Sequence, residues 1–154
     1  MPEFRSKYFG AVTYKEEAVL RFPLGLPGFA EEKRFLLIEQ PVNRPLVFLQ
    51  SLGRPELCFV ALPVLGMCPD YRLAVCAEDL EVLGLAGNRQ PLIGPEVLCL
   101  GIVSLAEGKP PTVNLLAPVV VNWKSRCAVQ AIQIDAGYSH EHPLSVSETA
   151  GSCS

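Results

Sequence analysis

The stretch TVNLLAPVVVN, residues 112–122, decides the fold of this chain. Val119 to Val121 form a run of β-branched residues, which is typical of a strand that is buried on both faces, or nearly so. Pro118 cannot donate a hydrogen bond to a neighbouring strand, so we expect it at a strand start, an edge or a bulge. The stretch therefore predicts a buried β-strand with the proline at a break in its pairing.

Two asparagines, Asn114 and Asn122, carry amides into this apolar stretch. A buried amide that lacks a hydrogen-bond partner costs roughly 1–3 kcal/mol, so each needs a partner if it is buried. One interpretation is that they hold loop ends through bonds from the side chain to nearby backbone. The other interpretation is that they shape a recognition surface. Nothing in the stretch has the pattern of a catalytic arrangement.

Short apolar segments recur on both sides of this stretch. Eight or nine of them, spaced roughly 8–12 residues apart with proline and glycine mainly between them, are typical of an antiparallel sandwich or barrel. One short helix is predicted at residues 78–84, where acidic residues open the segment and Gly84 can close it. We therefore predict an all-β fold, a compact antiparallel barrel-like or sandwich domain with one or two short helices. The expected extended segments are 8–14, 19–22, 35–38, 46–49, 58–62, 72–76, 96–105, 112–122 and 127–135.

A second notable stretch is FPLGLPGF, residues 22–29. Pro27-Gly28 predicts a turn, because proline presets the first turn position and glycine tolerates a positive φ at the next. The stretch lacks the Gly-Lys-Ser/Thr ending of a phosphate-binding loop. It is interpreted either as an apolar loop packed on the core or as a rigid loop that presents Leu26 and Phe29 on a binding face.

Length and composition favour a small globular protein. A chain of 154 residues with 49% hydrophobic and 19% charged residues fits one domain with a real core. No apolar run approaches the roughly 18–20 residues of a membrane span, and residues 1–7 lack the apolar core of a secretory signal, so a cytoplasmic location is expected. The net charge of −3 argues against direct nucleic-acid binding. The domain is expected at 1–144, before a disordered Ser/Thr/Gly-rich tail at 145–154.

The cysteines and histidines offer little support for an enzyme. No Cys-x-x-Cys pair occurs among the six cysteines, and most lie in apolar segments, so reduced structural thiols are expected and Cys153 in the tail is the one expected to react fast. His140 and His142 form a His-x-His pair that could bind a metal, but no further ligands are indicated, so exposed, non-catalytic histidines are expected. The cysteines are Cys58, Cys68, Cys76, Cys99, Cys127 and Cys153.

Several segments, in order along nearly the whole chain, resemble the flagellar assembly factor FliW family. The strongest are residues 22–29 and 112–122. The resemblance implies a compact β-barrel-like domain over 1–144 that is not an enzyme and carries no cofactor. The other matching segments are KYFG at 7–10, LQS at 49–51, PDY at 69–71, Gln130, and Tyr138 before HPL at 142–144.

The same resemblance implies two protein partners. Members act as a chaperone that binds flagellin in the cytoplasm, and they also bind CsrA, a translational repressor. When flagellin is secreted, free FliW captures CsrA at a surface distinct from its RNA site and thereby relieves repression of flagellin translation. We accordingly expect a chain that is a monomer when free, binds a CsrA dimer, and contacts neither nucleic acid nor membrane directly.

Two other functions remain open. One is a small-ligand-binding barrel whose mouth is lined by the Gly-Leu-Pro-Gly-Phe loop, and the other is a hydrolase that pairs a cysteine with His140 or His142. The candidate partner-binding residues come from the motif segments and are Leu26, Phe29, Gln50, Asp70, Tyr71, Asn114 and Asn122.

Overall fold

The computed structural model describes residues 1–134 and 137–144, which form ten strands, two α-helices and two short 3-10 helices. The predicted tail at 145–154 lies outside the described residues. The strands are β1 (Glu3–Ser6), β2 (Gly10–Thr13), β3 (Leu20–Arg21), β4 (Arg34–Glu39), β5 (Val47–Ser51), β6 (Cys58–Pro63), β7 (Val97–Ser104), β8 (Thr112–Asn122), β9 (Ala128–Gln130) and β10 (His142–Pro143). The helices are α1 (Val64–Met67), α2 (Ala77–Leu83), η1 (Glu16–Ala18) and η2 (Pro41–Asn43).

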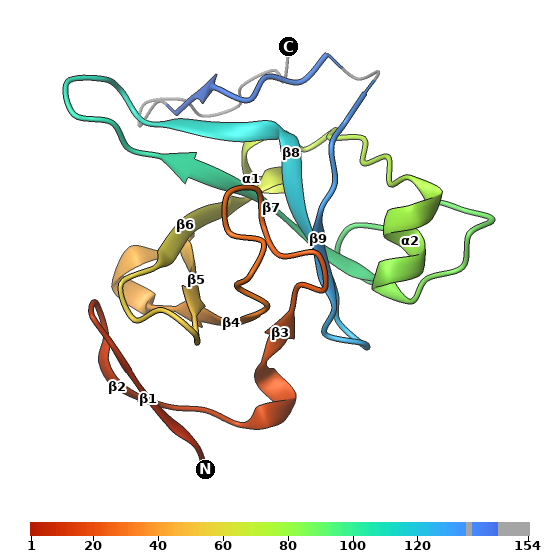
Figure 1. The fold of residues 1–154 in the computed structure, drawn as a ribbon. Helices are drawn as coiled ribbons and strands as arrows, with labels where there is room; N and C mark the ends of the chain where they lie inside the picture. The colour runs from red at the N-terminus through yellow and green to blue at the C-terminus, as the bar shows by residue number, and fades with distance from the viewer. Residues whose placement is uncertain (135–136, 145–154) are drawn as a thin grey trace.

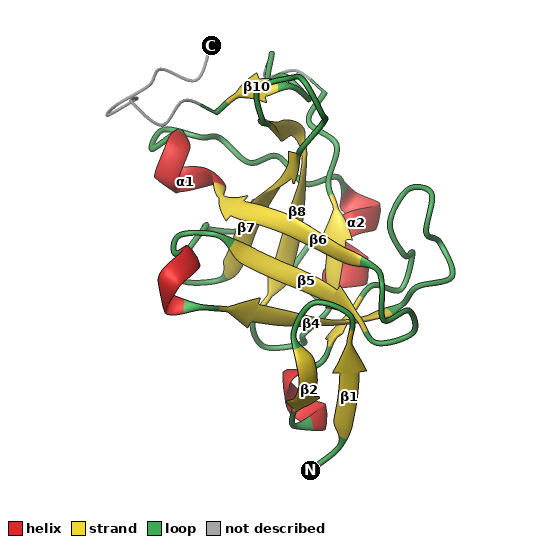
Figure 2. Cartoon of the chain, turned by 90° about the vertical axis from the view of Figure 1, so that its left-hand side faces the viewer, coloured by secondary structure: helices red, strands yellow, loops and turns green. Residues whose placement is uncertain are grey.

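The main sheet curls into a nearly closed barrel (Figures 1 and 2). Its strand order is β10-β8-β7-β6-β5-β4-β3, with β9 paired to β8, and every ladder between these strands is antiparallel. The two ends meet where the Arg21 N–H donates to the Arg126 carbonyl at 2.8 Å, next to a bridge between Arg21 and Cys127. The prediction of an all-β, antiparallel, barrel-like fold is confirmed.

Strand β8 is the buried strand that its valine run predicts. Val119 and Val121 point into the barrel core, and Val120 points to the opposite face into a second core, because successive side chains of a strand alternate between faces. The register with β7 shifts near Pro118, since Leu100 pairs with Val119 but Ile102 pairs with Asn114. The proline therefore lies at a break in the pairing, and β8 bends sharply along its length (Figure 1).

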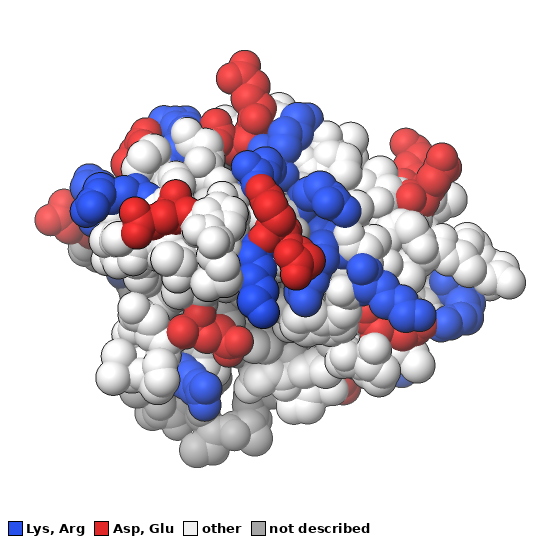
Figure 3. Space-filling view, turned by 90° about the horizontal axis from the view of Figure 1, so that it is seen from below, with Lys and Arg blue, Asp and Glu red and all other residues white. Residues whose placement is uncertain are grey.

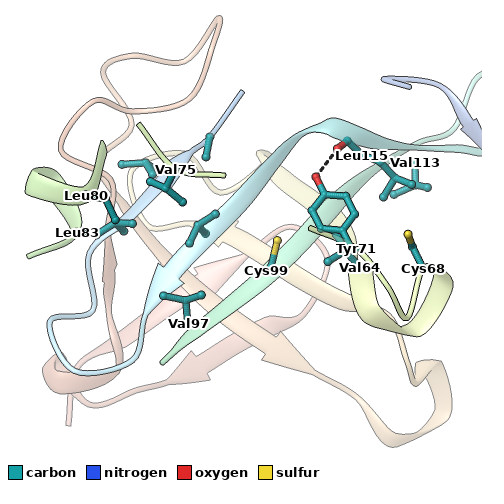
Figure 4. Packing of buried hydrophobic residues seen from close by; sticks show 13 residues of the cluster. Val64, Cys68, Tyr71, Val75, Leu80, Leu83, Val97, Cys99, Val113 and Leu115 are labelled. Carbon is teal, nitrogen blue, oxygen red and sulfur yellow. Dashed lines mark hydrogen bonds between the residues drawn. The ribbon is translucent and has the colours of Figure 1, made fainter. Parts of the chain in front are cut away.

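The second core lies outside the barrel, between β7, β8 and the segment that carries both α-helices (Figure 4). The predicted helix is confirmed as α2, in which Leu80 and Leu83 are buried. It ends at Gly84, which has φ 75° and accompanies a bond from the Leu85 N–H to the Leu80 carbonyl at 2.9 Å. The helix thereby packs against β9, and Leu80 and Leu83 share the second core with Val120 of β8.

Residues 72–76 are not a strand, although the sequence predicts an extended segment there. The backbone N–H groups of Ala74 and Val75 bond to side chains instead of to a neighbouring strand. The Gln133 amide accepts from the Ala74 N–H at 2.8 Å and donates to the Ala74 carbonyl at 3.0 Å. The Gln90 amide does the same for Val75, at 2.6 and 3.1 Å. Two glutamine side chains therefore take the place of a neighbouring strand.

The two ends of the described chain also differ from prediction. The last strand, expected at 127–135, is assigned only at β9, although the Ala131 and Gln133 N–H groups still donate to the Pro118 and Leu116 carbonyls. The β1–β2 hairpin was not predicted, because Glu3–Ser6 lacks an apolar run. The hairpin packs on the barrel through Phe9, whose ring lies 5.3 Å from that of Phe48.

The cysteines are buried to different degrees. Cys58, Cys76, Cys99 and Cys127 are free thiols as expected, whereas the expectation is wrong for Cys68, which is disulfide-bonded. Cys153 lies outside the described residues. Burial raises the pKa of Cys58 to about 11 and that of Cys99 to about 12, while Cys76 is exposed. Because the thiolate is the reactive form, exposure and pKa together set the order of reactivity.

A thiol-reactive dye is therefore expected to modify Cys76 first among these four residues in the native protein. Cys99 is expected to react only after denaturation, since it is 1% exposed and its thiol stays protonated at neutral pH. Peptide mass spectrometry after timed labelling measures both rates, and Cys76→Ser is the control for the fast site. Labelling of Cys99 as fast as that of Cys76 would contradict this core packing.

Candidate functional site

The loop at residues 22–29 is held rigid by its own backbone bonds. The Gly25 N–H donates to the Phe22 carbonyl at 2.8 Å, and the Phe29 N–H donates to the Leu26 carbonyl at 2.7 Å. Gly28 has φ 83°, as the predicted Pro27-Gly28 turn requires. Phe22 and Leu26 are buried in the barrel core, so the interpretation of an apolar loop packed on the core is confirmed.

A groove of about 680 Å³ lies between this loop and strands β6, β7, β8 and β9. It opens because the β6–β7 ladder stops at the pair Ala61–Ile102, after which β7 leaves the barrel with β8 as a long hairpin (Figure 1). The walls are mostly apolar. They include Leu24, Leu26, Phe59, Ile102, Asn114, Gln130 and Ile132.

Two amide side chains line the groove in orientations that their internal bonds fix. Asn114 Oδ1 accepts from the Leu116 N–H at 3.1 Å and from the Ala117 N–H at 2.9 Å, which are the local bonds that one interpretation of this residue predicts. Gln130 Nε2 donates to the Ala117 carbonyl at 2.9 Å. The side-chain oxygen of Asn114 and the side-chain nitrogen of Gln130 are thus already hydrogen-bonded to the backbone of β8 at residues 116 and 117.

Two large apolar side chains on the groove are exposed. Leu24 is 59% exposed and Ile132 is 65% exposed. Sequence reasoning missed both. In 131–134 the glutamine Gln133 is buried and the isoleucines Ile132 and Ile134 face outward, which reverses the usual pattern. The sequence carries no signal of this reversal, because it depends on the bonds that Gln133 makes to Ala74.

The seven predicted contact residues do not gather at one place. Leu26 and Asn114 line the groove, and the half-buried Phe29 lies beside it, with its ring 5.6 Å from that of Phe59 and the Arg54 guanidinium 5.8 Å from its centroid. Gln50 is fully buried beneath the N-terminal hairpin, where it accepts from the Ser6 hydroxyl at 2.8 Å.

The other three candidates lie on the side of the second core. The Tyr71 hydroxyl donates to the Leu115 carbonyl at 2.5 Å (Figure 4). The Tyr71 ring stacks on that of Tyr138, with 4.2 Å between the ring centroids. Burial raises the pKa of Tyr71. Asp70, next to it, is exposed. Asn122 is 5% exposed and ties β8 to the end of α2, because its Nδ2 donates to the Leu83 carbonyl at 2.7 Å.

Of the two histidines, only His140 lines the groove. His140 is exposed and lines it, and its Nε2 lies 3.4 Å from a Glu141 carboxylate oxygen, while His142 pairs with Val113 in the ladder between β10 and β8. No cysteine within the described ranges is among the residues that line this groove. Nor do residues 1–134 and 137–144 contain a group of three His, Cys, Asp or Glu side chains that could hold a metal ion.

Surface charge on the face seen from below is mixed. Lys and Arg side chains cross the middle of that face with Asp and Glu side chains between them (Figure 3). Arg34 and Glu16 form an exposed ion pair, with 2.6 Å between nitrogen and oxygen. In the described part of the chain, no helix is both long and apolar enough to cross a membrane.

Comparison with known proteins assigns the family. The sequence model described as "FliW protein" matches residues 3–144. The chain belongs to the FliW family. Curated relatives named "Flagellar assembly factor FliW" include that of Bacillus subtilis (strain 168), 33% identical over 90% of this chain and 94% of the relative. Another, from Pseudothermotoga lettingae, is 37% identical over 86% of this chain and 82% of the relative.

A solved structure agrees with the fold. The crystal structure of the flagellar assembly factor FliW has a TM-score of 0.80 to this chain at 30% identity, and the match covers 96% of this chain and 100% of that one. In this FliW-family chain, the two segments with the strongest family resemblance, 22–29 and 112–122, meet at the groove. The matching segments at 49–51 and 69–71 instead contribute buried residues to the hairpin contact and the second core.

Proposed function

We propose that this chain is a flagellar assembly factor that works by binding proteins and not by catalysis. In this proposal it binds flagellin in the cytoplasm and, once flagellin is exported, captures CsrA and relieves repression of flagellin translation. The observation that carries the proposal is membership of the FliW family over residues 3–144. The exposed apolar side chains at the groove support a binding role, because exposed apolar patches commonly mark protein-interaction sites.

Competition between the two partners is the expected behaviour. If flagellin and CsrA exclude each other, CsrA at ten times its own Kd should raise the apparent Kd for flagellin by about tenfold. Flagellin should weaken CsrA binding by the reciprocal effect, because linkage is symmetric. Isothermal titration of each partner into the protein, alone and with the other present, measures both factors.

Two results would contradict this function. One is a ternary complex that forms with undiminished affinity for both partners. The other is a purified protein that binds neither flagellin nor CsrA at micromolar concentration, with serum albumin as the control for non-specific binding.

A second candidate is a small-ligand-binding barrel. The groove volume of about 680 Å³ favours it, since ligand pockets commonly enclose roughly 300–1,000 Å³. The motif loop lines that groove, as this alternative predicts. Mass spectrometry of the protein purified from its native host under non-denaturing conditions tests it, and a stoichiometric bound metabolite would favour this reading over protein binding.

A further inference from the structure

We propose that the groove binds an extended segment of a partner protein, with the partner's main chain bonded to Asn114 and Gln130 and its apolar side chains packed on Leu24 and Ile132. The inference rests on the proposed function, because it takes the occupant from a protein partner. Beyond the proposed function, the inference specifies the surface at which the partner binds and the conformation of the bound segment.

The first argument is the free hydrogen-bonding capacity of the two amides. Because Asn114 Oδ1 already accepts two backbone N–H groups, its Nδ2 is the end that remains available as a donor. Because Gln130 Nε2 already donates to the Ala117 carbonyl, its Oε1 is the available acceptor. Within the described residues neither of these two atoms has a hydrogen-bond partner, and both residues line the groove. One donor and one acceptor match the C=O and N–H groups of a peptide backbone.

The second argument is that this molecule already uses amides in this way. Gln133 bonds both the N–H and the C=O of Ala74, and Gln90 bonds both groups of Val75. Neither Ala74 nor Val75 belongs to an assigned strand. An extended partner segment at the groove would repeat this arrangement with a different pair of amides.

A helical occupant fits less well. The N–H and C=O groups of a helix bond to each other along the helix, so only its ends could bond to the two amides. An extended segment instead offers backbone groups along its length and directs side chains to both sides. The apolar residues at the groove, with Leu24 on the loop and Ile132 beyond β9, provide an apolar surface for those side chains.

The apolar part of the proposal is tested with two matched leucines. Leu24 and Leu92 are both 59% exposed, but only Leu24 lines the groove. Flagellin and CsrA are each titrated into wild type, Leu24→Ser and Leu92→Ser. For the partner that occupies the groove, we expect at least a tenfold increase in Kd for Leu24→Ser and less than a twofold change for Leu92→Ser, with similar melting temperatures for both variants.

The main-chain part is tested with Asn114→Asp. Aspartate keeps an oxygen to accept from the Leu116 and Ala117 N–H groups, so the bend of β8 is retained, but it replaces the free donor with an acceptor. We expect at least a tenfold increase in Kd for the same partner and an unchanged melting temperature. Asn88→Asp, at an exposed position away from the groove, adds the same charge and is expected to bind like wild type.

The outcomes separate this inference from the function on which it rests. Wild-type protein that binds neither partner would overturn the proposed function, and the groove proposal with it. Wild-type protein that binds a partner, with Leu24→Ser and Asn114→Asp binding as tightly as their controls, would overturn the groove proposal alone. A loss for Leu24→Ser without a loss for Asn114→Asp would overturn the main-chain pairing, and therefore the extended conformation.

Discussion

Replacing Gln50 with leucine is expected to lower the free energy of unfolding by about 2–4 kcal/mol, since leaving a buried polar group unpaired costs about 1–3 kcal/mol. Gln50 is fully buried, and its Oε1 accepts from the buried Ser6 hydroxyl. Its Nε2 lies 2.9 Å from the Ser51 carbonyl and 3.1 Å from the Leu57 carbonyl. Leucine has a similar volume, so the loss comes from these bonds and not from a cavity.

The measurement is urea unfolding of wild type, Gln50→Leu, Ser6→Ala and the double variant. Ser6→Ala alone removes the hydroxyl that also accepts from the Tyr8 and Phe9 N–H groups, at 3.0 and 3.2 Å. The loss of stability in the double variant is expected to be smaller than the sum of the losses in the two single variants. Each single substitution leaves the other partner of the same hydrogen bond unpaired. Strict additivity would contradict a direct Ser6–Gln50 bond, and a Gln50→Leu variant as stable as wild type would contradict the buried network.

The parts of the fold that could be predicted are those set by local sequence. The valines at 119–121 predict a strand buried on both faces, and the structure places one core on each side of them. Gly84 ends α2 because glycine adopts the positive φ of that position without strain. Pro118 marks the break in β8 pairing because proline has no N–H to donate. Each of these three features of the fold is determined by only a few residues that are neighbours in the sequence.

The parts that could not be predicted depend on contacts between residues far apart in the sequence. Residues 72–76 form no strand, because the side chains of Gln133 and Gln90 bond to the backbone of Ala74 and Val75 where a neighbouring strand would otherwise bond. The N-terminal hairpin is held by Ser6 and Gln50, which are 44 residues apart. Side-chain pairing over such distances leaves no periodicity in the sequence, so pattern reasoning could not have found it.

The candidate site shows the same limit. Sequence reasoning singled out residues 22–29 and 112–122, and residues of both segments line one groove. Sequence reasoning could not show which leucine of the loop faces solvent. The direction of each leucine side chain depends on two consecutive turns, at 22–25 and 26–29. Leu26 is 2% exposed and Leu24 is 59% exposed. Asn114 was singled out as a polar residue in an apolar run, whereas Ile132 looked like an ordinary core residue.

The loop that carries Leu24 is expected to be highly sensitive to a methyl group at Gly25. Gly25 has φ 66°, and a Cβ there would lie 2.5 Å from Ala30 Cα and 2.6 Å from the Ala30 carbonyl oxygen. A left-handed conformation costs a residue with a side chain roughly 1–2 kcal/mol, and overpacking against fixed atoms adds about 1–3 kcal/mol. We therefore expect Gly25→Ala to destabilise the protein by about 2–5 kcal/mol.

Gly28→Ala is the matched control, because Gly28 also has a positive φ, 83°, but a Cβ there would have no neighbour within 4 Å. Gly28→Ala should lower the free energy of unfolding only by the cost of the left-handed conformation, about 1–2 kcal/mol. Thermal unfolding should separate the two variants by several degrees, since 1 kcal/mol corresponds to roughly 2–4 °C for a chain of this size. Equal melting temperatures would contradict the close contact between Gly25 and Ala30. Because this contact fixes the turn just before Leu26, a Gly25→Ala protein that still folds should also bind its partner more weakly than Gly28→Ala does.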